Sequence, residues 1–503
     1  MTPKNGPTQP EKSSPPSSTD ERDTRNLDRS LVHGVAWTAS AKWLSQIMTW
    51  AATLFVARTL TPDDYGLVAM AMVFTSLVEM ISDLGMGQAI VKHRELTTYQ
   101  LTQINGLCVL LGLAGWGVTC LAAYPVSLVF ETPALVPVVA VLGANFLVTS
   151  FRSVPFSLLQ RDLEFRTVAL NEGIQALFLS IAMVVFVMLG FGYWALVLGT
   201  LLSALCSTLA ACRIRPIGFA WPRYQDLGEI VTFGGQMVVL RFCWYVNTSA
   251  DQFITGKVLG QNALGAYSFA MMIAAMPLEK LTGLVMRVMP SVLSAVQQDS
   301  AAQRRYVLGF TQALSLLTLP AAVGVALVAD DFVRLALGDA WIPAILPLQI
   351  LSISAAYRST FPIIPTLAAI VGLSHLTMWS GIAASIVLPI AFLVGSRWGV
   401  AGIAAVWLIV YPFTNLPFYY LVFRKIGMSA GEYLRSLWPA TSTTCLMAAV
   451  VYGVHHVYPQ WPVALSLASD IATGALSYSV FLFILHRARI LALRDVYRLM
   501  RSK

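Results

Sequence analysis

Residues 55–72 read FVARTLTPDDYGLVAMAM, and residues 254–271 read ITGKVLGQNALGAYSFAM. The two stretches stand 199 positions apart and share their apolar positions and one glycine, Gly66 in the first copy and Gly265 in the second. Many secondary transporters are built from two related halves that face each other across a shared substrate site. The repeat therefore predicts two pseudo-symmetric bundles of helices around a common cleft.

The composition is that of a membrane protein. Of the 503 residues, 57% are hydrophobic and only 12% are charged, and the mean hydropathy is +0.68. Runs of 18 or more mostly apolar residues, each long enough to cross a hydrocarbon core about 30 Å thick, recur along nearly the whole chain. The expected class is an all-α polytopic membrane protein with no soluble domain between its spans.

We expect about 14 membrane-spanning helices, arranged as two six-helix bundles and two further C-terminal helices. The first bundle comprises Val35–Ala57, Gly66–Ile90, Leu101–Ala122, Leu135–Phe151, Val168–Leu189 and Tyr193–Cys212. The second comprises Ile230–Phe253, Gly265–Val288, Val307–Val328, Ala344–Ala368, Thr377–Gly395 and Val400–Phe423, and Trp438–Val457 and Val463–Leu485 follow it. The domain division is thus a disordered tail (1–34), an N-terminal lobe (35–212), a cytoplasmic linker (213–229), a C-terminal lobe (230–423), two added helices (424–485) and a basic tail (486–503).

Loop charges predict the orientation. With cytoplasmic termini, nearly all loop Lys and Arg residues lie inside, among them the run Arg152, Arg161 and Arg166 after the fourth span, and few lie outside. This bias follows the positive-inside rule, so both termini are expected in the cytoplasm. The basic tail then serves as an anchor near anionic headgroups, and no nucleic-acid partner is expected.

Catalytic and metal-binding motifs are absent from the sequence. All six cysteines fall within or at the ends of apolar runs, which argues against disulfides and metal sites. The chain has no Walker-type phosphate loop, no zinc-ligand spacing and no nucleophile elbow. We therefore expect no enzyme activity, no cofactor and no metal.

Five cations fall inside the predicted spans: Lys42, Arg241, Lys280, Arg287 and Arg358. Each costs roughly 2.5–3.5 kcal/mol at the centre of a membrane helix, so each should face water or a partner. Lys42 and Arg241 are equivalent under the 199-residue offset and would face one cleft from opposite walls. Guanidinium and ammonium groups both suit a diphosphate.

Structural explanations for these cations stay open. Lys42 and Arg241 would equally suit salt bridges to Glu79 and Asp251, and Arg287 lies close enough to the cytoplasmic edge to be an interface anchor.

Acidic residues in the spans suggest ion coupling. Glu79 and Asp83 stand four residues apart, on one face of the second helix, and two neighbouring carboxylates suit a proton or sodium site. Asp251, in the seventh span, is a third candidate. The alternative is that Asp83 ends its helix while Glu79 pairs with Lys42.

Four motifs resemble a known family. LTPDDYG (60–66), DLGMGQAI (83–90), LQRDLEFR (159–166) and DQFITGKVLG (251–260) are similar to those of the polysaccharide-transport branch of the multidrug/oligosaccharidyl-lipid/polysaccharide exporter superfamily. The resemblance covers about residues 30 to 425. It implies a flippase for lipid-linked oligosaccharides, in which cations of the first, second, seventh and eighth helices hold a pyrophosphate. Lys42, Arg241 and Lys280 lie on matching helices.

Three functions follow as hypotheses. The first is a flippase in the bacterial cytoplasmic membrane that moves an undecaprenyl-diphosphate-linked repeat unit, coupled to H⁺ or Na⁺ and working beside membrane lipids and a polysaccharide polymerase or other assembly partner. The second is an ion-coupled drug or metabolite antiporter of the same fold. The third is a membrane glycan polymerase or ligase, which the short external loops disfavour.

Overall fold

The structure is a computed structural model. It describes residues 45–83, 86–92, 95–223, 242, 245–457 and 461–501. Lys42 and Arg241, the starts of the first and seventh predicted spans, and residues 224–229 of the predicted linker lie outside these residues.

The described part consists of helices joined by turns and loops and contains no strand, as expected. Residues 45–59 and 245–254 are helical, and short helices η1 (Thr255–Leu259), η2 (Asp339–Ala344) and η3 (Ser396–Trp398) connect longer ones. The first group of longer helices is α2 (Pro62–Asp83), α3 (Met86–Lys92), α4 (Thr98–Val129), α5 (Leu135–Arg161), α6 (Phe165–Met188) and α7 (Trp194–Ile214). The second is α9 (Gly260–Ala295), α10 (Ser300–Leu327), α11 (Ala329–Ala336), α12 (Ile345–Thr360), α13 (Ile363–Ile370), α14 (Ser374–Gly395), α15 (Gly399–Lys425), α16 (Ala430–Val457) and α17 (Val463–Arg501).

Ten segments of the described chain are long and apolar enough to cross a membrane. Two of them, Tyr245–Ala295 and Ser374–Lys425, are 51 and 52 residues long and each contain a reversal of direction between two helices. The chain is therefore a multi-pass membrane protein. The count of 14 spans and the cytoplasmic termini stay predictions.

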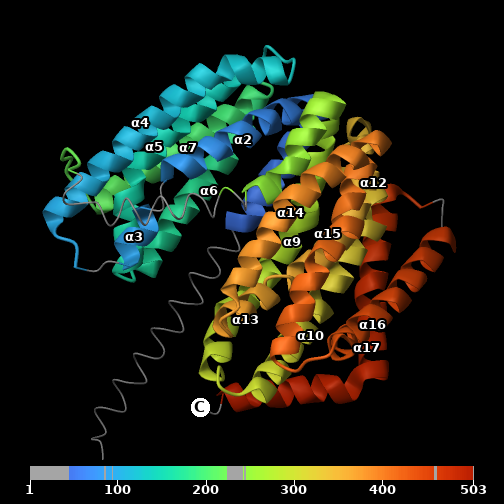
Figure 1. Cartoon of the computed structure of the whole chain (residues 1–503). Coiled ribbons are helices and arrows are strands. Elements are labelled where there is room, and N and C mark those ends of the chain that lie inside the picture. The colour runs from blue at the N-terminus through green and yellow to red at the C-terminus, as the bar shows by residue number, and fades with distance from the viewer. Residues whose placement is uncertain are drawn as a thin grey trace, which may run out of the picture.

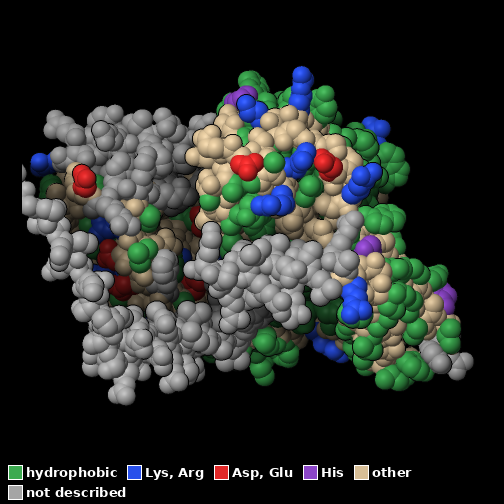
Figure 2. Space-filling model, turned by 90° about the horizontal axis from the view of Figure 1, so that it is seen from below, with side chains coloured by type: hydrophobic (Ala, Val, Ile, Leu, Met, Phe, Trp, Pro, Cys, Tyr) green, Lys and Arg blue, Asp and Glu red, His purple; other side chains and the backbone are tan. Residues whose placement is uncertain are grey.

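The helices form two bundles. Helices α2 to α7, the N-terminal bundle, lie on one side of the molecule, and α9 to α15, the C-terminal bundle, lie on the other, with α16 and α17 against the latter (Figure 1). The bundles meet near the top of Figure 1 and separate towards the bottom. We call the meeting end the outer end, because the loop charges predict that it faces outside. Figure 2 views the opposite end, where Lys and Arg side chains stand beside a few Asp and Glu side chains.

Each bundle has its own apolar core, and both cores extend across the outer contact. The core of the N-terminal bundle includes Leu264 from α9, and that of the C-terminal bundle includes Ala57 from the first helix. Burial of apolar side chains from both bundles therefore stabilises the outer end.

Several predicted boundaries were wrong. The fourth span does not end at Phe151, because α5 continues to Arg161 and carries Arg152 within the bundle rather than in a loop. The predicted span Gly66–Ile90 is two helices, α2 and α3. The predicted span Ala344–Ala368 is likewise divided near Pro362 into α12 and α13, since proline cannot donate the backbone hydrogen bond that would continue the helix.

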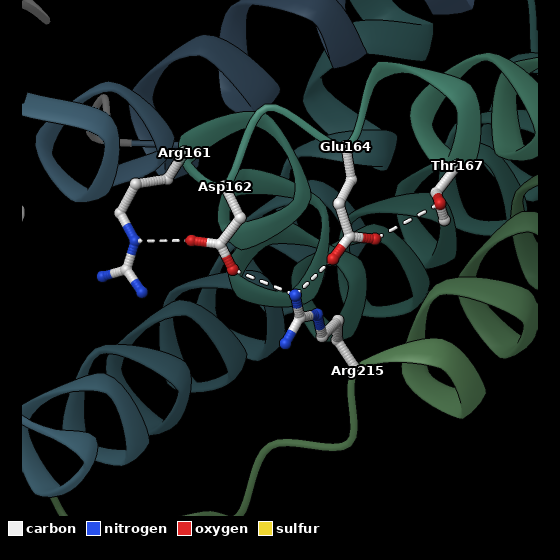
Figure 3. A network of polar contacts seen from close by, with 5 residues as sticks. All are labelled: Arg161, Asp162, Glu164, Thr167 and Arg215. Atoms are coloured by element: carbon white, nitrogen blue, oxygen red, sulfur yellow. Dashed lines mark hydrogen bonds and ion pairs between the residues drawn. The ribbon is translucent and has the colours of Figure 1, made fainter. Parts of the chain in front are cut away.

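The turn between α5 and α6 is held by charges at the inner end (Figure 3). Arg215, which follows α7, donates from Nη2 to Asp162 Oδ2 at 3.0 Å and also binds Glu164. Arg161 Nε lies 3.4 Å from Asp162 Oδ1, and the Thr167 hydroxyl donates to Glu164 at 3.3 Å. Much of the LQRDLEFR motif thus ties three helices together at this end.

The end of the chain lies across the inner side of the bundle. Helix α17 changes direction at His486, whose backbone angles are not helical, and its last part runs across the lower end of Figure 1. That placement fits the interfacial anchor expected for the basic tail.

Candidate functional site

The two copies of the sequence repeat touch each other at the outer end. A Cβ atom at Gly66 would lie 1.9 Å from the carbonyl oxygen of Gln261, and a Cβ atom at Gly265 would lie 1.7 Å from that of Pro62. Both obstacles are backbone atoms, so no rotamer change would make room. The repeated glycine is therefore what lets α2 and α9 cross in backbone contact.

Hydrogen bonds also join α2 and α9 at this crossing. Asn262 donates from Nδ2 to Asp63 Oδ2 at 2.7 Å, and Gln261 donates from Nε2 to the Asp63 carbonyl oxygen at 2.7 Å. Residues 63 and 262 are equivalent under the 199-residue offset. Equivalent residues meet only on a symmetry axis, so the pseudo-two-fold axis passes through this contact.

Arg58 and Lys257, which are equivalent in the sequence repeat, each bind a residue of the opposite bundle. Arg58 donates from Nη1 to the carbonyl oxygen of Leu335, in the C-terminal bundle, at 2.9 Å. Lys257 Nζ lies 2.9 Å from Glu131 Oε1, in the loop between α4 and α5 of the N-terminal bundle. The hydrogen bond and charge of Lys257 hold the pKa of Glu131 below its usual value. Each bundle thus extends one cation to an outer segment of the other.

Trp341 anchors the end of the first helix. Its side chain is 0% exposed, and its Nε1 donates to the Ala57 carbonyl oxygen at 2.8 Å. The rings of Tyr65 and Phe269 pack on it, with centroids 5.3 and 4.6 Å away. Aromatic residues from α2, α9 and η2 therefore form one buried cluster beneath the outer surface.

Further inward, α2 and α9 present exposed faces. On α2 the exposed positions Met72, Ser76 and Glu79 follow helical spacing, and on α9 Lys280 and Arg287, seven residues apart, are exposed on one face. Charged side chains exposed within membrane spans should face water rather than lipid. Three of the predicted site residues are thus exposed on the two helices that cross at Gly66 and Gly265.

The C-terminal bundle contains a buried polar cluster around Asp251. This carboxylate is 1% exposed, and its Oδ2 accepts hydrogen bonds from Tyr267 at 2.6 Å and from Trp407 Nε1 at 2.9 Å. The guanidinium of Arg358 lies over the Trp407 ring, 4.1 Å from its centroid, and is close enough to attract Asp251. Asp251 and Arg358, predicted for different roles, therefore share one cluster.

A second cluster, in the N-terminal bundle, was missed by the sequence analysis. Arg152 donates from Nη1 to Gln175 Oε1 at 2.8 Å and to the Ser207 hydroxyl at 2.7 Å, and Glu79 and Glu172 both attract it. Ser207 in turn donates to Asn171 Oδ1 at 2.7 Å.

A signal for Arg152 exists in the sequence. Residues 151–153 read FRS in α5, the fourth predicted span, and residues 357–359 read YRS in α12, within the tenth predicted span. Each bundle thus carries one arginine that follows an aromatic residue and precedes a serine, although their spacing of 206 differs from the 199 of the main repeat.

The described structure does not test three of the predicted site residues. Lys42 and Arg241 lie outside the described residues, and Asp83 ends α2 with its side chain outside them.

The fold is that of a transporter superfamily. The structure is similar to the lipid II flippase MurJ in an inward closed conformation, with a TM-score of 0.74 and 14% identity, covering 90% of this chain and 100% of that one. It is also similar to an inward-facing multidrug resistance MATE family transporter of the MOP superfamily, with a TM-score of 0.59 and 14% identity, over 79% of this chain and 95% of that one. The chain therefore has the fold of these two solved transporters.

Sequence comparison identifies the family. Residues 55–346, more than half of the chain, match the model of the polysaccharide biosynthesis protein family, and the chain belongs to that family. It is 24% identical to the lipopolysaccharide biosynthesis protein WzxC of Escherichia coli over 82% of this chain and 85% of that protein. It is 25% identical to the succinoglycan biosynthesis transport protein ExoT of Rhizobium meliloti over 93% and 96%. The resemblance noted from the four motifs is confirmed.

Proposed function

We propose that this protein is a flippase that carries an undecaprenyl-diphosphate-linked oligosaccharide across the bacterial cytoplasmic membrane by alternating access. The observation that carries the proposal is the pair of repeat-related helices α2 and α9. They touch through Gly66 and Gly265 at the outer end and present charged, exposed positions further inward. The names of the relatives, a polysaccharide transport protein and a lipid II flippase, support the substrate class.

The diphosphate binds the cations of α9. Lys280 and Arg287 share one exposed face of that helix. We include Lys42 and Arg241 in the same diphosphate site, because they are equivalent positions of the sequence repeat. An ammonium and a guanidinium each satisfy anionic oxygens, and the low-dielectric walls of a cleft strengthen the attraction relative to open water. Arg358 contributes less directly, because its guanidinium is already stacked on Trp407 and attracted by Asp251.

Ion coupling belongs to the Asp251 cluster. The affinity of a buried carboxylate for H⁺ or Na⁺ depends on the dipoles and charges that surround it. Tyr267 from α9 and Trp407 from α15 both donate to Asp251, so a shift of α9 during opening would alter its surroundings. Glu79, on the exposed face of α2, and Asp83 at the end of that helix are the second coupling candidates. On the outer side, the released repeat unit passes to a polysaccharide polymerase.

The test uses a strain lacking the endogenous flippase. The doubly substituted K280Q/R287Q protein should lose most surface polysaccharide, and lipid-linked oligosaccharide should accumulate in the inner leaflet. The R305Q/R424Q protein is the matched control, because it also removes two exposed positive charges, from the inner ends of α10 and α15. Membrane abundance is measured for both.

Two outcomes would contradict the proposal. Equal polysaccharide output from the two variants, at equal abundance, would remove the diphosphate assignment. Efflux of cationic dyes that depends on Glu79 and Asp251, without any effect on polysaccharide, would instead support the antiporter that the MATE-like fold also allows.

A further inference from the structure

Three potential metal ligands from three helices meet near the outer end of the C-terminal hairpin α16–α17. They are Asp331 in α11, His455 at the end of α16 and Asp470 near the start of α17, and one ligand atom from each lies within 4.8 Å of the other two. His455 Nδ1 lies 2.9 Å from Asp470 Oδ2. Asp331 is 139 positions from Asp470 in the chain, so only the tertiary fold brings them together.

One buried oxygen atom of Asp331 has no hydrogen-bond partner among the described residues. Its side chain is 9% exposed, and its Oδ2 is buried without a hydrogen bond to any residue that the structure describes. The nearby Arg334 is engaged by Asp330, whose two oxygens both lie 3.0 Å from its Nε. Asp470 is also buried, at 4% exposed. Two carboxylates so placed repel each other unless a positive charge, from the imidazole of His455 or from a bound cation, lies between them.

From this geometry we propose that Asp331, His455 and Asp470 bind a divalent transition-metal ion, with Zn²⁺ as the probe. One imidazole and two carboxylates are borderline and hard ligands that suit Zn²⁺ or Mn²⁺, and the two negative charges balance the ion. Ligand atoms about 2.1 Å from a tetrahedral ion are roughly 3.4 Å apart, so small side-chain rotations complete the site. A water molecule takes the fourth position.

The site fastens the C-terminal hairpin to the C-terminal bundle. Beneath it lies a cavity of about 370 Å³ between α10, α16 and α17, lined by Gly324, Met447, Gly474 and Tyr478 among others, with Asp470 on its wall. A bound ion joins α11, α16 and α17 at the outer end of this cavity, and so fixes how far α17 stands from α10. This role is independent of the diphosphate and coupling assignments made above.

The experiment measures metal binding by the full-length, tag-free protein in detergent. After chelator treatment and dialysis, Zn²⁺ is titrated by calorimetry, bound metal is counted by mass spectrometry, and thermal unfolding is recorded with and without Zn²⁺. We expect about one high-affinity ion per chain and a rise in the melting temperature on binding. Asp331→Asn, His455→Ala and Asp470→Asn should each weaken binding more than about tenfold.

Adjacent residues provide matched controls. Asp330→Asn removes the neighbouring carboxylate, which binds Arg334, and His456→Ala removes the neighbouring imidazole, which contacts the Tyr452 carbonyl oxygen. Both should bind Zn²⁺ like the unchanged protein. Asp331→Asn should fold, because asparagine has nearly the same size and the substitution removes a buried carboxylate whose Oδ2 has no hydrogen-bond partner among the described residues. The proposal is overturned if the unchanged protein binds no Zn²⁺, or if the control variants lose as much affinity as the ligand variants.

Discussion

Asn262 donates a 2.7 Å hydrogen bond to the carboxylate of Asp63, and each residue is the other's counterpart in the sequence repeat. The pair marks the place where the two bundles contact each other by symmetry. Around it the glycine crossing, the exchanged cations Arg58 and Lys257, and the buried Trp341 all join the bundles at the outer end. Alternating access requires this group of contacts to break when the outer end opens, and the predictions below depend on that requirement.

Gly265→Ala should weaken the outer contact. The new Cβ would lie 1.7 Å from the Pro62 carbonyl oxygen, and overpacking of this kind costs about 1–3 kcal/mol, which shifts a two-state equilibrium roughly 5- to 150-fold. Spin labels at Ala134→Cys and Ala340→Cys, two exposed outer positions on opposite bundles, should report longer distances. A cysteine-free background is needed, because Cys120 and Cys445 are exposed.

The control for this substitution lies on the same helix. A Cβ atom at Gly283 meets nothing within 4 Å, so Gly283→Ala should leave the distance distribution unchanged. If Gly265→Ala also leaves it unchanged, the glycine crossing does not govern opening.

Acid should weaken the outer contact through Glu131. Because Lys257 holds the pKa of Glu131 below its usual value, the ion pair favours the closed outer end above about pH 5 and loses its effect as the pH falls through that depressed pKa. The same spin-label pair should therefore show a small opening as the pH falls below the ordinary carboxyl pKa of about 4.3.

In Glu131→Gln this component of the pH response should be absent, while Asp330→Asn, which breaks a pair within α11 only, should keep it. The response should also shrink at high salt, because both partners are exposed. A pH response identical in Glu131→Gln and in the unchanged protein would show that other groups cause it.

Trp341→Phe should be less damaging than Trp341→Ala. Phenylalanine keeps the packing against Tyr65 and Phe269 but loses the hydrogen bond to the Ala57 carbonyl oxygen, a loss of about 0.5–1.5 kcal/mol. Alanine removes the buried ring as well, at about 3–5 kcal/mol. Thermal unfolding in detergent measures both. Trp398→Phe, at an exposed position, should change little, and equal effects at the two sites would contradict the anchoring role of Trp341.

Asp251 and Arg358 should be energetically coupled. Asp251→Asn removes the charge that attracts Arg358 but still accepts from Tyr267 and Trp407, whereas Arg358→Gln leaves a buried carboxylate without its nearby cation. Arg358→Gln should therefore cost more stability, and the double variant should cost less than the sum of the two, by about 0.5–3 kcal/mol. A matched cycle of Arg358→Gln with Glu432→Gln should be additive. Strict additivity in both cycles would show that Asp251 and Arg358 do not interact.

Much of the fold followed from the sequence because membrane insertion depends on local properties. Long apolar runs are helical in lipid whatever their neighbours, since every backbone polar group must be satisfied within the segment. The class followed from these runs, the two-bundle arrangement from the 199-residue repeat, and the family from the resemblance of four motifs. Boundaries were less accurate where polar residues continue a helix inside the bundle. Arg152 lies within α5, where Gln175 and Ser207 accept hydrogen bonds from its guanidinium, and no local pattern reveals those partners.

The candidate site, like the fold, could be predicted from the sequence only in part. The sequence by itself determined that charges stand within the spans and that Gly66 and Gly265, Arg58 and Lys257, and Asp63 and Asn262 are equivalent pairs. Only the tertiary structure decided that these pairs meet at the outer end, that Asp251 lies with Arg358, and that Asp331, His455 and Asp470 converge where no metal motif is present in the sequence. Periodicity and charge are properties of neighbouring residues, whereas such convergence depends on how distant helices pack, and packing is decided by the whole set of buried contacts at once.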